Sequence, residues 1–170
     1  MAAHDWDLLR DLIGARLEGI ARAFHEQGGE VDESTGALEL VFEGGRVLHL
    51  TTATNGESVR VAGGPWVDPI ADPEAEIDAA WAREHGRRVR VDVSARPGYA
   101  GAVGARLSLT RWLGNEHQSV AGVEMHFYDA VLTFVSWGDD DHVLIGGADA
   151  VPAGWGVLPL WSPRAMTMEA

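Results

Sequence analysis

The sequence predicts a single α+β domain over residues 1–170, mainly antiparallel β, in which two duplicated β-meander units form one sandwich or barrel-like sheet. Three observations predict this class: apolar residues that alternate with polar ones at a period of two, Gly-Gly and Asn-Gly turn signals between the alternating segments, and an internal repeat. The chain has 170 residues, of which 46% are hydrophobic and 23% charged, a composition that suits one compact domain with a sizeable core.

The internal repeat is the most informative of these observations. The tetrapeptide Gly-Ala-Arg-Leu occurs at residues 14–17 and again at residues 104–107. Residues 38–42 align with residues 123–127 at a shift of 85, and from residue 47 to residue 63 the shift is 84 without a gap. We therefore predict a first repeat at 14–64 and a second repeat at 104–147, with a connector at 65–103 and a C-terminal tail at 148–170.

The N-terminal segment carries two conflicting patterns. Apolar residues recur there at helical spacing (Leu9, Ile13, Leu17, Ile20 and Phe24), which alone predicts one long amphipathic helix from Asp5. The counterpart of its second half, residues 107–112, alternates like a strand, and two copies of one unit are expected to share a fold. We therefore predict a short N-terminal helix that ends near Ile13 and a strand that begins near Ala15.

Each repeat continues with the pattern of a β-meander. In the first repeat we predict strands at residues 38–42, 47–53 and 58–62, joined by a Gly44-Gly45 turn and an Asn55-Gly56 hairpin. Residues 128–130 and 138–141 occupy the corresponding turns of the second repeat. Between the repeats, Asp72 and Pro73 suit the start of a connecting helix over 73–85, and residues 88–94 alternate as a bridging strand.

The charge balance limits the classes of partner. The chain has 26 acidic and 13 basic residues, all of the latter Arg, for a net charge of -13. This charge argues against nucleic acid and favours a basic protein partner. The absence of Lys beside abundant Ala, Gly and Arg is typical of a high-GC genome such as an actinobacterial one. The acidic N-terminus and the lack of a long apolar run predict a cytoplasmic protein without a membrane span.

One face of the second repeat carries most of the candidate functional residues. If residues such as Val123, Met125 and Phe134 face the core, alternation puts a different set on the opposite face: Glu124, His126, Tyr128, Trp137 and His142. Tyr128 and Trp137 suit a protein-binding surface, because these residue types dominate interface hot spots. Glu124 and His126 suit acid-base work. The same face also suits simple packing against the connecting helix or the Trp-containing tail.

The turns add an acidic element to this face. Asp139, Asp140 and Asp141 form one turn of the second repeat, and Glu57 lies near the corresponding turn of the first. We expect these to be solvated turn carboxylates that form an acidic rim for a basic partner. They do not have the spacing of an EF-hand, the seven His show no metal-ligand spacing, and there is no Cys, so we predict no metal and no cofactor.

The turn and strand pattern resembles small β-rich domains of uncharacterised bacterial families, some of which are immunity proteins of polymorphic toxin systems. The residues that carry the resemblance are 14–17, 38–50 and 55–61. The resemblance implies a compact acidic inhibitor that binds one cognate basic protein, a toxin, and performs no reaction.

Two other functions fit the same residues. The first is a small β-barrel or sandwich with an apolar, Trp-lined cavity that binds or cyclises a small molecule. A closed apolar pocket reached by His126 or His142 would favour it, whereas a filled interior with an exposed aromatic patch would favour the binding protein. The second is a homo-oligomer in which the face that carries Trp137 is the self-interface.

Overall fold

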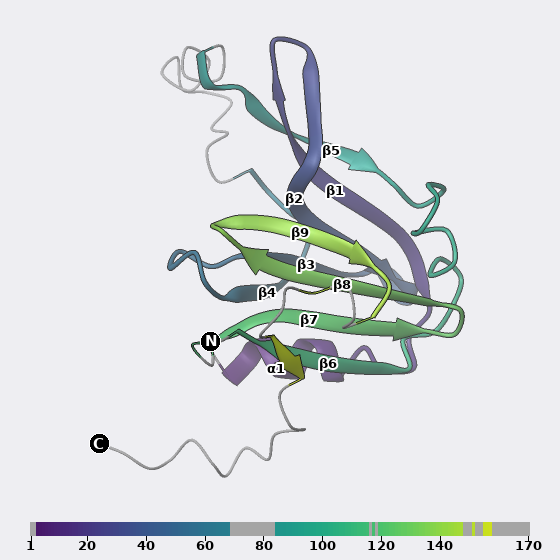
Figure 1. Cartoon of the computed structure of the whole chain (residues 1–170). Helices are drawn as coiled ribbons and strands as arrows, with labels where there is room; N and C mark the ends of the chain where they lie inside the picture. The colour runs from purple at the N-terminus through teal and green to yellow at the C-terminus, as the bar shows by residue number, and fades with distance from the viewer. Residues whose placement is uncertain are drawn as a thin grey trace.

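A computed structural model of the chain describes residues 3–68, 84–115, 117, 119–147, 151 and 155–157. The described residues form a short helix, a 3-10 turn and ten strands in two five-stranded antiparallel sheets (Figure 1). The helix α1 spans Ala3–Arg10 and the 3-10 turn spans Glu43–Gly45. The strands are β1 (Leu17–Gln27), β2 (Glu30–Phe42), β3 (Arg46–Thr52), β4 (Val59–Gly63), β5 (Arg87–Asp92), β6 (Leu109–Gly114), β7 (Val120–Phe127), β8 (Ala130–Trp137), β9 (Asp140–Ile145) and β10 (Gly156–Val157).

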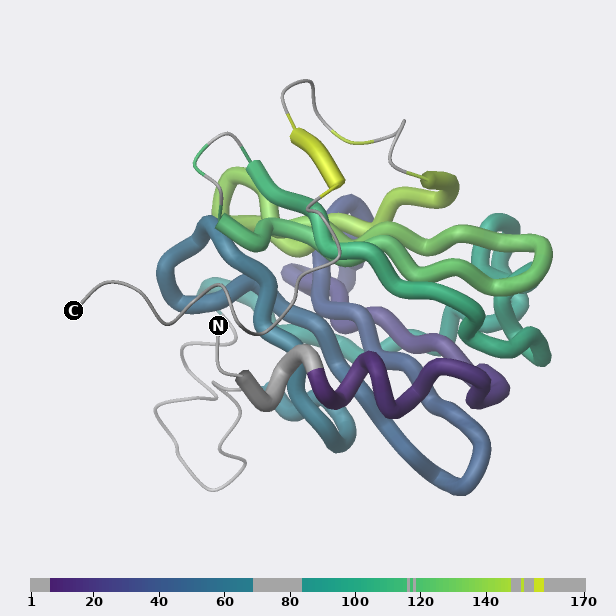
Figure 2. The backbone as a smooth tube through the Cα atoms, turned by 90° about the horizontal axis from the view of Figure 1, so that it is seen from below, coloured from purple at the N-terminus to yellow at the C-terminus, as the bar shows by residue number. Residues whose placement is uncertain are grey.

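The two sheets have the same strand order. The first runs β4-β3-β2-β1-β5, and the second, taken from the matching edge, runs β9-β8-β7-β6-β10. In Figure 2 the purple and blue strands of the first sheet lie in one layer beneath the green strands of the second. The predicted class, mainly antiparallel α+β, is confirmed, and the two stacked sheets make it a sandwich.

The conflict in the N-terminal segment is resolved in favour of a strand. The helix α1 ends at Arg10, and β1 begins at Leu17. A bulge between Leu17 and Gly19 gives β1 one more residue than the facing part of β2. Leu17 and Ile20, three residues apart, therefore point to the same face and are both buried. The helix-like spacing of the apolar residues is the product of a bulged strand.

The two Gly-Ala-Arg-Leu segments pair with each other. Arg16 and Arg106 face each other in an antiparallel bridge. Four backbone hydrogen bonds flank it in two equivalent pairs: Gly14 N to Leu107 O and Gly104 N to Leu17 O, both 2.7 Å, and Leu17 N to Ala105 O and Leu107 N to Ala15 O, both 2.9 Å. Exchanging the two repeats leaves this pattern unchanged, so a pseudo-twofold axis passes between the two arginines.

The registers of the meanders also correspond, with one correction to the predicted alignment. Leu50 pairs with Leu38 in the first sheet, and its equivalent Phe134 pairs with Val123 in the second, as the shift of 85 to 84 requires. On the other side, however, Leu50 pairs with Val61 and Phe134 with Val143. The last strands are therefore related by a shift of 82 rather than 84, because the β3–β4 connection is two residues longer. A slip of two keeps every side chain on its face.

Each repeat is completed by a fifth strand outside the predicted boundaries. The bridging strand predicted at 88–94 is β5, and it pairs with β1, whereas β10, within the predicted tail, pairs with the equivalent strand β6. The structural unit is thus longer than 14–64 and 104–147. The predicted connecting helix at 73–85 lies outside the described residues except for Glu84 and His85, which are helical.

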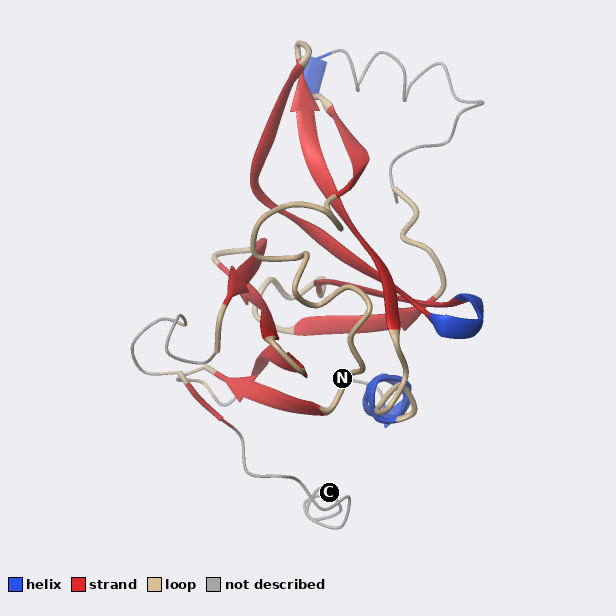
Figure 3. Ribbon diagram, turned by 90° about the vertical axis from the view of Figure 1, so that its right-hand side faces the viewer, coloured by secondary structure: helices blue, strands red, loops and turns tan. Residues whose placement is uncertain are grey.

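The core lies between the two sheets. The side chains of the second repeat that were predicted to point inward are at most 3% exposed: Val123, Met125, Phe127, Leu132 and Phe134. They join the inward side chains of the first sheet in one cluster. The helix α1, seen end-on in Figure 3, adds Leu9 to it beside β4. The far ends of β1 and β2, with β5, extend beyond the two layers (Figures 1 and 3).

Candidate functional site

The tips of two equivalent hairpins, β3–β4 and β8–β9, lie against each other at one end of the sandwich. The Ser136 hydroxyl donates a hydrogen bond to the carbonyl of Gly56 (3.1 Å). A side-chain carbon added at Gly56 would overlap Asp139 Oδ1, so the carboxylate of Asp139 lies directly over this glycine. The contact joins residues about 80 positions apart in the sequence.

This contact gathers acidic side chains from both repeats. Glu57, Asp139 and Asp140 are all exposed, and we call these three residues the acidic rim. Gly138 and Asp139 both have positive φ (64° and 69°), the conformation of a type I′ hairpin turn, which aspartate tolerates better than most residues. The sequence predicted four acidic residues in or near these turns, and three of them, Glu57, Asp139 and Asp140, therefore lie together at one end of the sandwich.

Trp137 and His142 lie beside the acidic rim on the outer face of the second sheet. Trp137 ends β8, is 57% exposed and pairs with Asp140 of β9. Its ring centroid lies 5.9 Å from that of His142, at a tilt of 49°. An exposed tryptophan, held on one side by a neighbouring ring and bordered by carboxylates, suits contact with a cationic surface.

The expectation that Asp141 belongs to a solvated turn is wrong. Asp141 is 7% exposed and points toward the first sheet, because it shares the parity of Val143 on β9, which packs on the core. Its Oδ1 accepts a hydrogen bond from the backbone amide of Thr52, at the end of β3. The guanidinium of Arg88 lies 3.8 Å from Oδ2. Asp141 therefore ties the two sheets together and does not present a charge to a partner.

Burial raises the pKa of Asp141, outweighing the hydrogen bond from Thr52 and the charges of Arg88 and Arg22, which lower it. The folded state then binds this proton more tightly than the unfolded chain, so stability falls as the pH rises from the ordinary carboxyl range through the raised pKa. Asp141→Asn retains an acceptor for Thr52 without the buried charge. We expect its free energy of unfolding to equal or exceed that of the wild type at pH 7, by a margin that shrinks toward pH 4.

Urea denaturation of both proteins at pH 7 and near pH 4 measures this difference. Asp140→Asn, which removes an exposed charge from the adjacent position, is the matched control and is expected to leave the midpoint nearly unchanged. An Asp141→Asn variant that is less stable than the wild type by the same amount at both pH values would contradict the expectation.

Glu124 and His126 form a hydrogen-bonded pair on the outer face, but only the histidine is accessible. The side chain of Glu124 is 1% exposed and that of His126 is 24% exposed. Glu124 Oε1 accepts hydrogen bonds from His126 Nε2 and from Arg111 Nη1 (3.3 Å). The sequence left open whether this face is exposed, and at Glu124 it is buried, because Arg111 and the chain around Gly147 lie close to the carboxylate.

The first repeat contains the same buried carboxylate. Glu39, the equivalent of Glu124, is 3% exposed. Its Oε1 accepts two hydrogen bonds from Arg90, and its Oε2 accepts one from the backbone amide of Trp66 (2.8 Å). A glutamate that is buried and paired with arginine in both repeats has the features of a structural element of the unit, which weakens the acid-base interpretation of Glu124.

Tyr128 belongs to a different end of the molecule from Trp137. It is 88% exposed in the turn between β7 and β8, whereas Trp137 ends β8. The seven residue steps along that strand separate the two ends by about 23 Å. The two aromatic residues of the predicted face therefore do not form one anchor pair, and a partner at the acidic rim contacts only Trp137 of the two.

Comparisons with known proteins give no relative: the chain matches no protein-family model, no curated protein and no solved structure. Within the described ranges, no three His, Asp or Glu side chains are placed to hold a metal ion. No helix in that part of the chain has the length and apolar character needed to cross a membrane.

The roles of several arginines are not apparent from the sequence. Arg22 is 3% exposed at the edge where the sheets meet, and Arg111 neutralises Glu124. Neither stands out in the sequence, because each depends on a partner in another strand. Arg16 and Arg106 were visible as the arginine of the repeated tetrapeptide, but their pairing across the pseudo-twofold axis was not.

Proposed function

We propose that this protein is a non-catalytic binding protein whose acidic rim and Trp137 contact a basic protein partner. The observation that carries the proposal is the contact between the two hairpin tips. It places Glu57 of the first repeat with Asp139 and Asp140 of the second, beside an exposed tryptophan. The resemblance to immunity proteins extends the proposal to its finer form, in which the partner is a toxin and the protein is its inhibitor.

The charge distribution supports a basic partner. The net charge of -13 attracts cationic proteins over a distance of about one Debye length, and the acidic rim directs them to one end of the sandwich. No arginine is adjacent in the sequence to a residue of the acidic rim. The nearest is Arg60, three positions after Glu57. Exposed carboxylates increase association rates, whereas the indole of Trp137 supplies the contact that slows dissociation.

The interior of the sandwich favours the binding protein over the small-molecule alternative. The inward side chains of both sheets pack against one another in one cluster, and the largest of them, such as Phe42 and Phe134, are fully buried. His142 lies on the outer face beside Trp137, away from that cluster. The small-molecule alternative would be favoured by a closed apolar pocket that His126 or His142 reaches. His126 lines a shallow depression that is open to solvent, and Trp137 remains outside the packing between the sheets as an exposed aromatic group.

A titration of the ¹⁵N-labelled protein with a hexa-arginine peptide tests the acidic rim. We expect the largest shifts at the Trp137 indole N–H and at the amides of residues 56–58 and 138–140. Glu57→Gln, Asp139→Asn and Asp140→Asn together are expected to weaken binding about tenfold at low salt, because each exposed charge pair contributes up to ~1 kcal/mol. Trp137→Ala is expected to weaken it further.

The matched control removes three other exposed carboxylates: Glu18→Gln, Glu30→Gln and Asp129→Asn. It has the same net charge as the rim variant, and we expect its affinity to stay within about twofold of the wild type. Equal losses in the two variants would show attraction to the net charge alone and end the proposal. Light scattering that shows a dimer, converted to a monomer by Trp137→Ala, would instead assign the Trp137 face to self-association.

A further inference from the structure

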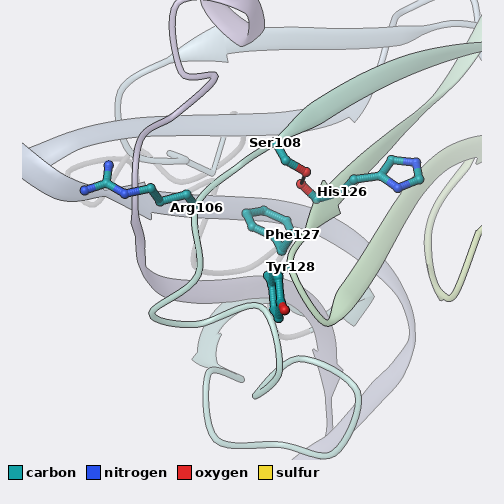
Figure 4. A pocket seen from close by; sticks show the side chains of 5 residues that line it. All are labelled: Arg106, Ser108, His126, Phe127 and Tyr128. Carbon is teal, nitrogen blue, oxygen red and sulfur yellow. Dashed lines mark hydrogen bonds between the residues drawn. The ribbon is translucent and has the colours of Figure 1, made fainter.

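A shallow depression lies at the opposite end of β8 from the acidic rim. It has a volume of about 490 Å³, is open to solvent, and is lined by Arg106, Ser108, His126, Phe127 and Tyr128 (Figure 4). Phe127 is 3% exposed and forms its floor, whereas Tyr128 stands out into solvent. Its volume falls in the range of about 300–1,000 Å³ that is typical of small-molecule sites.

The residues that line this depression differ from their equivalents in the first repeat, which the pseudo-twofold axis identifies. The five equivalent positions in the first repeat are Arg16, Glu18, Val41, Phe42 and Glu43. The arginine and the phenylalanine are retained in the second repeat. Ser108 and Tyr128 replace the two glutamates, and His126 replaces the valine. Two carboxylates are thus absent and an imidazole is added, in a protein whose net charge is -13.

Arg106 lines the depression, and its bridge partner Arg16 makes different contacts. The side chain of Arg106 is 57% exposed, and its Nη1 contacts the carbonyl of Gly14 and Glu43 Oε1 (3.2 Å). The pseudo-twofold axis relates Arg106 to Arg16 and Glu43 to position 128. A carboxylate at position 128 would therefore pair with Arg16 as Glu43 pairs with Arg106. Because position 128 holds a tyrosine, the exposed side chain of Arg16 has no ion pair with any described residue.

We infer that this depression binds a small organic anion. Its oxyanion, a carboxylate or a phosphate, binds the guanidinium of the exposed Arg106 side chain in competition with Glu43. Ser108 and Tyr128 add no negative charge there, and Arg16, the bridge partner of Arg106, adds a second positive charge to the same part of the molecule. The apolar body of the anion packs on Phe127 and Tyr128. In Figure 4, Arg106 and His126 extend to opposite sides of these two rings, so the anion binds at the arginine end and His126 borders the other end of the ligand. The site is separate from the acidic rim and does not depend on its proposed function.

A titration of the ¹⁵N-labelled full chain with benzoate, phenylphosphate and inorganic phosphate tests this site. We expect shifts at the amides of residues 106 and 126–128 and at the Arg106 Nε–H. A preference for benzoate or for phenylphosphate assigns the oxyanion as carboxylate or phosphate. Inorganic phosphate that binds as tightly as phenylphosphate would overturn the assignment of the rings to an apolar body.

Two changes restore the residues of the first repeat: Ser108→Glu and Tyr128→Glu. Both positions are exposed, and we expect the double variant to weaken binding at least about tenfold through like-charge repulsion. Val31→Glu and Thr54→Glu, also exposed, add the same charge elsewhere and are expected to leave affinity within about twofold. Undiminished binding by the first pair, or equal losses in both pairs, would overturn the inference.

Glu43→Gln provides a second test that does not introduce charge into the depression. It removes the carboxylate that competes for Arg106, so binding of the preferred probe is expected to tighten by up to about fivefold. Weaker binding by this variant would show that Arg106 must be held by Glu43 and would contradict the assignment of its guanidinium to the anion.

Discussion

Replacing Phe134 with alanine is expected to lower the free energy of unfolding by about 3–5 kcal/mol. Phe134 is fully buried on β8, inside the second sheet, between Val123 and Val143 on the neighbouring strands. Strands surround it on both sides and the first sheet covers it, so the backbone cannot collapse into the space that the ring leaves. Denaturation in guanidinium chloride, followed by circular dichroism, measures the loss.

Phe134→Leu and Trp137→Ala bracket this prediction. Phe134→Leu keeps most of the apolar volume and is expected to cost less than about 1.5 kcal/mol. Trp137→Ala removes a larger side chain from the same strand, but one that is 57% exposed, and is expected to cost less than Phe134→Ala. If Trp137→Ala destabilised the protein as much as Phe134→Ala, the inward and outward faces of β8 would be wrongly assigned.

Gly36→Ala is expected to destabilise the protein on the order of 3 kcal/mol, through steric overlap and backbone strain. Gly36 has a φ of +149°, and a Cβ there would lie 2.2 Å from the carbonyl oxygen of Ala23 on β1. The obstacle is backbone, which cannot rotate away. The carbonyl of Gly36 also accepts hydrogen bonds from Nε and Nη2 of the buried Arg22, so a shift of β2 disturbs that arginine as well.

Gly44→Ala is the control for the effect of conformation alone. Gly44 also has positive φ (+78°), but a Cβ there meets nothing within 4 Å. We expect a cost of about 1 kcal/mol, the usual penalty for alanine in the left-handed region. Thermal unfolding of the two variants measures the difference between them. Equal costs at the two positions would mean that the approach of Gly36 to Ala23 is not a constraint on the fold.

Local patterns in the sequence predicted the elements of the fold well. Alternation at a period of two marked β2, β3, β7 and β8, and the turn signals Gly44-Gly45 and Asn55-Gly56 fall between strands as predicted. The repeat decided the one ambiguous segment correctly, because the strand character of residues 107–112 outweighed the helical spacing of 17–24. The bulge that produced this spacing is a property of the pairing of β1 with β2, which a single strand pattern does not contain.

The candidate site was predicted less completely. Residue type correctly marked Asp139 and Asp140 as exposed acids, whereas the exposure of Trp137, left open by the sequence, was decided by the structure. The burial of Asp141 was in principle readable, since it shares the parity of Val143, which packs on the core. The separation of Tyr128 from Trp137 was also implicit, because the residues that join them form a single extended strand.

The sequence by itself determined the class of the fold, the inward face of each strand and the duplication of the meander. These depend on side-chain periodicity and turn chemistry within a few residues of each other. Only the tertiary structure decided which distant groups meet: Arg16 with Arg106, Gly56 with Asp139, and Asp141 with Thr52. Those contacts join residues some 80 to 90 positions apart, and they form because burying two apolar faces against each other brings the repeats together, whatever polar groups lie at their edges.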